Sequence, residues 1–534
     1  MPPVPLAPVP FRLLIGFGLA VLGWPSIYGD TGAGNGPMPA AEPARPEGAL
    51  HPAPTTPVRL ENAVVKVFAT TRTPEPFQPW TKAQPREISG TGVVIDGHRI
   101  LTNAHVVLYA SQIQVQANRS GDKLSAHVVA VSPGIDLAVL TLDDTSFFDT
   151  HPPIKRASIL PSVKDPVLVY GFPTGGTSLS ITKGIVSRIE FSGYNFPVSG
   201  LRIQIDAAIN AGNSGGPAVA GDAMVGLAFS HLGGAENIGY IIPCEEIELF
   251  LRGTAHGEKY QKPGLYDEVQ TLQNPTLRAY LKAGPEITGM VVTHPDATVP
   301  GNPLRQWDIV THLGSVPVAD DGMVSITDTL RVSFRYMVQK LAQNGQIPLQ
   351  VYRAGRSLAV SMPVPGDHPL LLADLQGAYP SYFVFGPLVF SAATAQFFAG
   401  IGGNASTVDA LAAMDNPLVT RRGDSPAFPG EQLVVVSSPF FPHDSAKGYD
   451  NATASVVHTI NGIPIKNLRH LVEVLRDCRD EYLRIEFAGR NRENLVFRRA
   501  ELAAATEEIL NDNGIRSQTS PDLAKVWTAA TVAK

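Results

Sequence analysis

Cysteine and net charge are both scarce in this sequence. Only two of the 534 residues are cysteines, Cys244 and Cys478, and they lie far apart in the chain. Such a pair forms neither a metal-ligand spacing nor a disulfide framework, so we expect two buried free thiols. Charged residues make up 17% of the chain, the formal net charge is −6, and no Lys/Arg-rich run occurs. This balance gives no electrostatic reason to expect a nucleic-acid partner.

Long hydrophobic runs are scarce as well. The apolar run near the N-terminus, residues 13–24, is short for a membrane-spanning helix, which needs about 20 apolar residues. Arg12 precedes it and small and polar residues follow, which resembles a secretory signal peptide. We predict that residues 1–29 are a signal peptide or an uncleaved anchor, and that this segment alone could contact a membrane. Residues 30–57, rich in Pro, Ala and Gly, are expected to form a flexible linker, and the rest is expected to be exported to the periplasm.

Glycine and proline, in contrast, are plentiful, at 49 and 46 residues. Between these turn formers the chain carries short segments of apolar or alternating residues. The strand candidates are residues 63–69, 90–95, 99–102, 113–117, 126–131, 137–142, 167–170, 185–189 and 201–205. Short strands at this spacing indicate an all-β barrel or sandwich. A helical pattern at residues 243–252 is expected to close this domain.

One serine lies in an unusual setting. Ser214 stands among three glycines, after an apolar run that ends near residue 209. Glycine backbone freedom lets N–H groups converge beside a serine hydroxyl, which is the arrangement that acyl transfer needs. A Gly-rich loop with an incidental serine fits this stretch, taken alone, equally well. The stretch also matches the G-x-S-x-G elbow of α/β-hydrolases, but an elbow leads directly into a helix, and here Pro217 and a strand-like segment follow.

The order of three polar residues decides between these interpretations. Taken alone, His105 is more simply a core or surface histidine, and Asp136 a turn or cap residue. Together with Ser214 they follow the order His, Asp, Ser of chymotrypsin-like double barrels, whereas α/β-hydrolases have the order Ser, Asp, His. An esterase with the α/β-hydrolase fold would need a catalytic histidine after Ser214, such as His231 or His256.

Several segments together resemble the HtrA/Deg serine proteases, and in pattern the plant-type Deg proteases more than the commonest bacterial ones. Three of these segments contain the candidate residues. Of the other two, residues 182–187 match the segment before the regulatory loop of that family, and residues 237–243 match its last barrel strand. The segments are residues 101–107, 136–140, 206–217, 182–187 and 237–243. The resemblance covers most of the chain after the linker.

The resemblance implies a role for each candidate residue. Ser214 attacks the scissile carbonyl, His105 takes the serine proton and later gives it to the leaving amine, and Asp136 orients the histidine. The backbone N–H groups of Gly212 and Ser214, together with that of Asn213, form the oxyanion hole. No metal and no organic cofactor is implied.

Specificity and regulation are implied less directly. Ile209 matches a wall of the first specificity pocket, and Leu227 and Phe229 lie nearby; plain barrel core is the weaker alternative for each of the three. No acidic residue lies in the matched segments where it would favour a Lys or Arg substrate, so we expect cleavage after small to medium apolar residues. Residues 190–200 resemble the sensor loop of this family. We hypothesise that they relay one of two signals to residues 210–213: peptide binding to a PDZ domain, a module described below, or contacts within an oligomer.

Two aromatic residues near the start of the β region stand out. Phe77 and Trp80 lie in a Pro-rich loop, residues 74–85. They resemble the aromatic contacts that join protomers in this family. Packing onto the barrel explains them as well.

A second module is expected at residues 262–366. Its strands and one helix resemble a PDZ domain, which binds an extended peptide C-terminus by adding it to a sheet edge. Gly264, Leu265 and Tyr266 fall where the carboxylate-binding loop lies, so peptide C-termini are the expected ligand. The loop departs from the usual Gly-Leu-Gly-Phe sequence, so the sequence does not decide whether it binds a free carboxylate.

A third module is expected at residues 369–499. Residues 456–465 repeat the strand–turn–strand pattern of residues 309–318, which supports a second PDZ-like domain with an insertion from about 391 to 430. In plant-type relatives such a domain resembles an assembly element, with an internal segment filling its own groove. The aromatic stretch 380–390 is core or an intersubunit contact. Residues 500–534 are expected to form a short C-terminal helix followed, after Asp512, by a loosely held tail.

The predicted fold is therefore mainly β, with a chymotrypsin-like double β-barrel protease domain (residues 58–255) followed by two PDZ-like α+β domains. The predicted function is an ATP-independent serine endopeptidase that degrades unfolded or damaged polypeptides. Its PDZ domains would select substrates and join protomers into trimers or multiples of trimers. The alternative is a peptide-binding chaperone or scaffold whose protease domain is largely dormant.

Overall fold

The computed structural model describes residues 60–195, 197–231, 238–366 and 368–529. The predicted signal peptide and linker lie outside these residues. Among the described helices, none combines the length and the apolar character that crossing a membrane would require.

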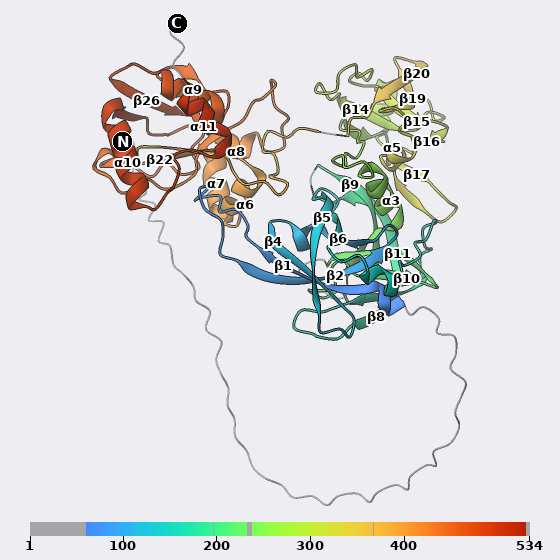
Figure 1. The fold of residues 1–534 in the computed structure, drawn as a ribbon. Helices are drawn as coiled ribbons and strands as arrows, with labels where there is room; N and C mark the ends of the chain where they lie inside the picture. The colour runs from blue at the N-terminus through green and yellow to red at the C-terminus, as the bar shows by residue number, and fades with distance from the viewer. Residues whose placement is uncertain (1–59, 196, 232–237, 367, 530–534) are drawn as a thin grey trace, which may run out of the picture. The chain divides into compact units, whose positions relative to one another are not determined.

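Six strands of the N-terminal part close into a barrel with the order β1-β2-β3-β6-β5-β4 (Figure 1). The strands and short helices of this part are β1 (Val64–Thr71), β2 (Arg86–Ile95), β3 (Arg99–Thr102), β4 (Ala110–Ala117), β5 (Lys123–Ser132), β6 (Leu137–Leu142), η1 (Leu60–Ala63), α1 (Ala104–Val107) and α2 (Phe147–Thr150). Val65, Val93 and Leu140 are fully buried in its core, as alternating strands with one apolar face require.

A second six-stranded barrel follows, with the order β10-β11-β12-β9-β8-β7. Its elements are β7 (Pro166–Gly171), β8 (Ser180–Gly193), β9 (Ser199–Ile205), β10 (Pro217–Ala220), β11 (Ala223–His231), β12 (Gly239–Pro243) and the closing helix α3 (Cys244–Gly253). Val186, Ile203 and Ile205 are fully buried in it. In α3, Ile247 and Phe250 pack with core residues of the first barrel. The two barrels and the closing helix confirm the prediction for this domain.

Residues 262–366 form a sheet with the order β13-β14-β15-β19-β20, with β16 paired to β15. The elements are β13 (Glu268–Thr271), α4 (Pro275–Tyr280), β14 (Met290–His294), β15 (Ile309–Leu313), β16 (Val316–Pro317), β17 (Met323–Ser325), β18 (Arg331–Ser333), α5 (Tyr336–Leu341), β19 (Gln346–Arg353) and β20 (Arg356–Pro363). Val310 and Val351 are buried in the core of this sheet. The strand β13 forms one edge.

The C-terminal domain contains a three-stranded sheet, β21-β22-β23, and a four-stranded sheet, β25-β24-β26-β27. The strands are β21 (Tyr382–Phe385), β22 (Leu388–Ala392), β23 (Val434–Val436), β24 (Val457–Ile460), β25 (Ile463–Pro464), β26 (Tyr482–Phe487) and β27 (Leu495–Arg498). The helices are α6 (Ala395–Gly402), α7 (Ala405–Ala413), α8 (Pro417–Thr420), η2 (Asp444–Ala446), α9 (Leu468–Asp477), α10 (Arg499–Asp512) and α11 (Pro521–Thr528). Helices α6 to α8 occupy the predicted insertion.

The aromatic stretch of this domain is core. Phe383 and Phe390 are fully buried and Phe385 is nearly so. Of the two interpretations that the sequence left open, the structure therefore favours packing inside the domain over a contact between subunits.

The prediction of a loose tail after Asp512 is wrong. The N–H of Val384 donates to the carbonyl of Gln518 (2.8 Å), and the N–H of Ser520 donates to the carbonyl of Tyr382 (3.0 Å), so residues 518–520 pair with β21. Helix α11 follows and packs on α9. A segment of the chain itself thus adds to this sheet edge, in the way that the resemblance to plant-type relatives implied.

The aromatic loop before β2 packs on the C-terminal domain. The ring of Phe77 lies 5.4 Å from that of Phe397, and the ring of Trp80 lies 5.5 Å from that of Phe441. Both rings thus have partners within their own chain, and a role of these residues in joining protomers stays a prediction.

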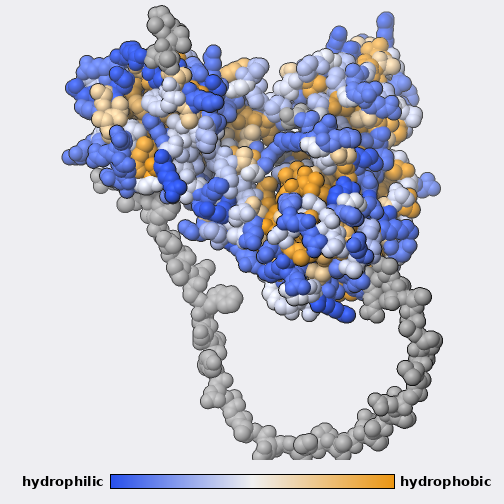
Figure 2. All heavy atoms as spheres, viewed as in Figure 1, coloured by the Kyte–Doolittle hydropathy of each residue, from blue (hydrophilic) through white to orange (hydrophobic). Residues whose placement is uncertain are grey.

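Large hydrophobic residues remain exposed on the barrels and on the segment between them. They are Val128, Val129, Ile159, Val163, Ile181 and Ile185. Figure 2 shows hydrophobic residues gathered on one face over the barrels, whereas hydrophilic residues prevail over the rest of that view. Exposed apolar patches of this kind mark surfaces that contact other molecules.

Candidate active site

His105 and Asp136 form a close pair in the first barrel. His105 lies in α1, directly after β3, and its Nδ1 is 2.7 Å from Oδ2 of Asp136. The backbone N–H of His105 donates to Oδ1 of the same carboxylate (2.9 Å). Asn103 Nδ2 donates to the backbone carbonyl of Asp136 (2.9 Å). Asp136 is therefore held by both the ring and the backbone of His105.

The electrostatics of this pair favour a charged ring. The Asp136 side chain is 11% exposed, whereas the His105 side chain is 49% exposed. Burial lowers the pKa of His105, but the hydrogen bond to Asp136 and the charge of Asp136 raise it by more, so the pKa lies above its ordinary value. Because Nδ1 faces the carboxylate, Nε2 is left on the other side of the ring to exchange a proton.

Two carbonyls of the loop before Ser214 point into the fold. The carbonyl of Ala211 accepts from the N–H of Thr174 (2.8 Å), and the carbonyl of Asn213 accepts from the N–H three residues later (2.9 Å). In a planar trans peptide the C=O and the next N–H point in opposite directions. The N–H groups of Gly212 and Ser214 therefore point away from these partners, and neither donates to another residue in the described part of the chain.

The third predicted oxyanion donor has a different environment. The N–H of Asn213 donates to the carbonyl of Asn210 (3.0 Å). Gly212 has a φ of +98°, and a Cβ there would lie 2.4 Å from the carbonyl oxygen of Phe172. The loop therefore needs glycine at this position.

Thr91, which the sequence interpretation treated only as a strand residue, holds this loop in place. It is fully buried, and its Oγ1 donates to the carbonyl of Gly212 (2.7 Å) and accepts from the N–H of Phe172 (2.9 Å). Its N–H donates to the carbonyl of Ser214 (2.8 Å), and its own carbonyl accepts from Thr102 Oγ1 (2.7 Å). In the sequence, only its position between two glycines sets Thr91 apart. Its hydrogen bonds to the serine loop depend on tertiary structure and could not be predicted.

Gly90 brings the two halves of the site together. A Cβ there would lie 2.8 Å from Cγ2 of Val106 and 3.3 Å from the carbonyl oxygen of Ser214. Because Val106 follows His105, the segments that carry the histidine and the serine lie against the same strand. No hydrogen bond joins Ser214 Oγ to His105 among the contacts of the described residues.

The predicted pocket residues are all buried. Ile209 is 7% exposed, Leu227 is fully buried in the barrel core and Phe229 is 8% exposed. A Cβ at Gly239 would lie 2.7 Å from Cδ1 of Ile209. Residues 232–237, which follow β11, lie outside the described part.

The segment that resembles a sensor loop contacts one of these residues. Residues 190–193 continue β8, and the Tyr194 ring lies 5.2 Å from the ring of Phe229. The Arg202 guanidinium lies over both rings, 4.6 Å from that of Tyr194 and 5.4 Å from that of Phe229. Burial raises the pKa of Tyr194 well above its usual value. The predicted regulatory segment and the predicted pocket are thus adjacent.

The predicted carboxylate-binding loop is engaged within its own domain. The N–H of Gly264 donates to the carbonyl of Pro365 (3.1 Å), and Leu265 is 4% exposed. The Tyr266 ring lies over Gly264 and stacks on His368 at 4.0 Å.

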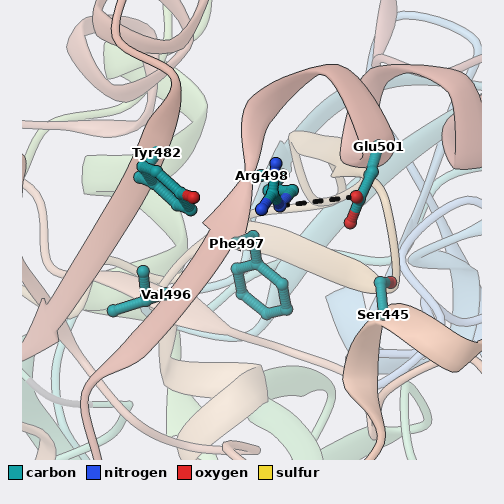
Figure 3. Close-up of a pocket in the computed structure, with 6 residues that line it drawn as sticks. All are labelled: Ser445, Tyr482, Val496, Phe497, Arg498 and Glu501. Carbon is teal, nitrogen blue, oxygen red and sulfur yellow. Dashed lines mark ion pairs between the residues drawn. The ribbon is translucent and has the colours of Figure 1, made fainter.

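A pocket of about 230 Å³ lies in the C-terminal domain, apart from these residues (Figure 3). It is lined by Ser445, Tyr482, Val496, Phe497, Arg498 and Glu501. Arg498 lies 3.7 Å from Glu501 and 3.3 Å from Glu481. Its charged groups pair with one another, and it lies apart from the barrels that carry the candidate site.

Comparisons with known proteins place the chain in a family. Residues 90–227 match the trypsin-like peptidase domain model, and residues 373–522 match a PDZ domain model. The mitochondrial Protease Do-like 4 of Arabidopsis thaliana is 34% identical over 86% of this chain and 85% of its own length. The chloroplastic Protease Do-like 2 of the same plant is 33% identical over 86% of this chain and 75% of its own length. Among solved structures, the HtrA-type protease AlgW with decapeptide is 26% identical, with a TM-score of 0.44, and the match covers 58% of this chain and 98% of that one. The extent of the plant similarity and the peptidase match show that the chain belongs to the Do-like (HtrA/Deg) family and is a serine endopeptidase.

Proposed function

We propose that this protein degrades unfolded or damaged polypeptides without ATP, with Ser214, His105 and Asp136 as the catalytic triad. The observation that carries the proposal is the His105–Asp136 pair beside a serine loop whose Gly212 and Ser214 N–H groups donate to no other described residue.

In the proposed reaction Ser214 Oγ attacks the scissile carbonyl while His105 Nε2 takes its proton. His105 then gives this proton to the leaving amine, and a water molecule repeats the sequence to release the acyl group. Asp136 keeps the imidazole in the Nδ1–H tautomer and stabilises its charged form. The raised pKa of His105 supports this role.

The oxyanion that forms in this step is bound by the N–H groups of Gly212 and Ser214. The N–H of Asn213 is engaged with Asn210, so it supports the shape of the loop instead of binding substrate. Losing one such donor typically costs on the order of 100- to 1000-fold in rate.

The two PDZ-like domains have different tasks in this proposal. The first, residues 262–366, binds extended peptide segments, and Gly264, Leu265 and Tyr266 form one end of its binding edge. The second has its β21 edge filled by residues 518–520, so it serves assembly of the homo-oligomer instead of substrate capture. The exposed apolar residues of the barrels support contacts between protomers, and trimers or multiples of trimers stay a prediction.

The names of the relatives support a place of action. The Arabidopsis proteases are named mitochondrial or chloroplastic, which supports an organellar or otherwise exported location for this chain. The periplasm is the bacterial equivalent and stays a prediction.

A dormant scaffold is the second candidate, and one observation favours it. Ser214 Oγ makes no hydrogen bond to His105 in the described residues, as in an enzyme at rest. Digestion of casein by wild type and by Ser214→Ala separates the two functions. Degradation by wild type alone supports the protease, whereas no degradation and no labelling of Ser214 by a fluorophosphonate, even with added peptides, supports the scaffold.

A further inference from the structure

The segment that leads into the edge strand of the first PDZ-like domain is covered by an arginine. β13 pairs with β14 on one side and with no other described strand. Arg335, at the N-terminal end of α5, donates from Nε to the carbonyl of Leu265 (3.1 Å) and from Nη2 to the carbonyl of Asp267 (2.8 Å). One guanidinium therefore joins two carbonyls of the chain that leads into the edge strand.

These carbonyls are the groups that an added strand would use. Carbonyls two residues apart that accept from one planar group point to the same side of the chain, and an incoming peptide offers N–H groups at this spacing. Arg335 thus occupies the acceptors that strand addition requires. While it stays there, a peptide cannot pair with Leu265 and Asp267.

Besides these two carbonyls, the Arg335 guanidinium lies 5.4 Å from the centroid of the Phe334 ring. No carboxylate oxygen lies within ion-pair distance of it among the described residues. The Asp267 carboxylate, which is fully buried, accepts instead from the N–H of Asp296 (2.9 Å) and from Asn302 Nδ2 (2.8 Å). Burial lowers the pKa of Arg335, and the charge of Asp267 offsets this only in part. A carboxylate brought by a ligand would be a stronger acceptor for the guanidinium than two neutral carbonyls.

We propose that Arg335 is a gate on the peptide edge of this domain, which opens for an extended peptide that carries an acidic side chain. The carboxylate of the peptide draws the guanidinium away from Leu265 and Asp267, and the freed carbonyls then pair with the peptide backbone. The inference rests on the proposed peptide-binding role of this domain. It adds the residue that controls access and the chemistry of the preferred ligand.

The test uses the full chain with Ser214→Ala, so that bound peptides are not cut. Two fluorescent peptides are compared by anisotropy, an extended apolar peptide with one Glu and its twin with Gln at that position. In the Ser214→Ala protein the Glu peptide is expected to bind about tenfold more tightly, as for a site that is open in roughly a tenth of the molecules. Adding Arg335→Met is expected to tighten binding of the Gln peptide about tenfold and to remove the preference for Glu.

Two further variants keep the result interpretable. Arg331→Met removes an arginine of the same domain that pairs with Asp321 (3.0 Å) at the surface, and it is expected to change neither affinity. Arg335→Lys keeps the charge but cannot join two carbonyls with one planar group, so the Gln peptide should bind more tightly while the preference for Glu remains. Thermal unfolding of each variant checks that the domain folds.

Three results would overturn the proposal. If folded Arg335→Met binds the Gln peptide no more tightly than its parent, Arg335 does not block access of peptides to this edge. If it binds this peptide more weakly, Arg335 is part of the binding surface. If no variant binds either peptide, the edge is not a peptide site. None of these results depends on proteolysis, so a failure here is distinct from a failure of the casein test.

Discussion

Replacing Thr91 by valine tests whether the serine loop is held by this hydroxyl. The change keeps the shape of the side chain but leaves the carbonyl of Gly212 and the N–H of Phe172 without their partner in a fully buried position. Each buried group left unpaired costs about 1–3 kcal/mol of folding stability. Because the Gly212 carbonyl is no longer held, the loop loses alignment of its oxyanion donors, and kcat should fall by on the order of 100-fold.

The assay measures kcat and KM with a peptide substrate, together with thermal unfolding. Thr91→Ser keeps the hydroxyl and should retain kcat within about threefold, since the hydrogen bonds remain. Thr71→Val is the matched control, because Thr71 is also buried in the first barrel and its Oγ1 bonds to the carbonyl of Arg86, away from the loop. It should lower stability without lowering kcat. A folded Thr91→Val enzyme with unchanged kcat would refute the reasoning.

Three further predictions concern other parts of the chain. Because Asp136 raises the pKa of His105 and only the neutral ring accepts a proton, kcat/KM of wild type should fall on the acid side at a higher pH than for an ordinary histidine near 6.5. Asp136→Asn should move this limb to lower pH and reduce kcat about 10⁴-fold, as a pH–rate profile would reveal. Glu246→Gln should destabilise the protein by about 3–5 kcal/mol in chemical denaturation, because it leaves the charge of Lys262 buried without its partner. Trp527→Ala removes a ring that lies 4.9 Å from that of Phe383, and it should speed hydrogen exchange of the β21 amides by loosening the C-terminal segment.

The barrels could be predicted because their strands carry local signals. Apolar alternation between Gly- and Pro-rich turns marks most of the twelve barrel strands. β8 exposes the limit of this reasoning, since it runs from Ser180 to Gly193 whereas the sequence suggested only residues 185–189. Its first half alternates exposed and partly buried residues, such as Lys183 and Gly184, so the apolar signal is weak there.

The parts of the site that the sequence missed depend on contacts between distant residues. Thr91 and Gly212 are 121 positions apart, and nothing local to Thr91 points to the loop that it holds. Helix α11 was missed for a different reason. Ser520 and Pro521 are ordinary helix-start residues and Leu523 and Val526 follow at helical spacing, so the signal for α11 was present. The pairing of residues 518–520 with β21, however, could not be read from either segment.

Both PDZ-like domains have an edge strand that another part of the chain covers, but the two covers differ in strength. On β21 the cover is the segment 518–520, joined by backbone hydrogen bonds and followed by α11, whose Trp527 packs on Phe383. On the segment before β13 the cover is one side chain with two hydrogen bonds to neutral carbonyls. Displacing the first requires a whole segment to unpair, whereas displacing the second breaks two hydrogen bonds and moves the guanidinium away from the buried Asp267 carboxylate, in exchange for a better acceptor. The first edge is therefore suited to permanent structure, and the second to a peptide that comes and goes.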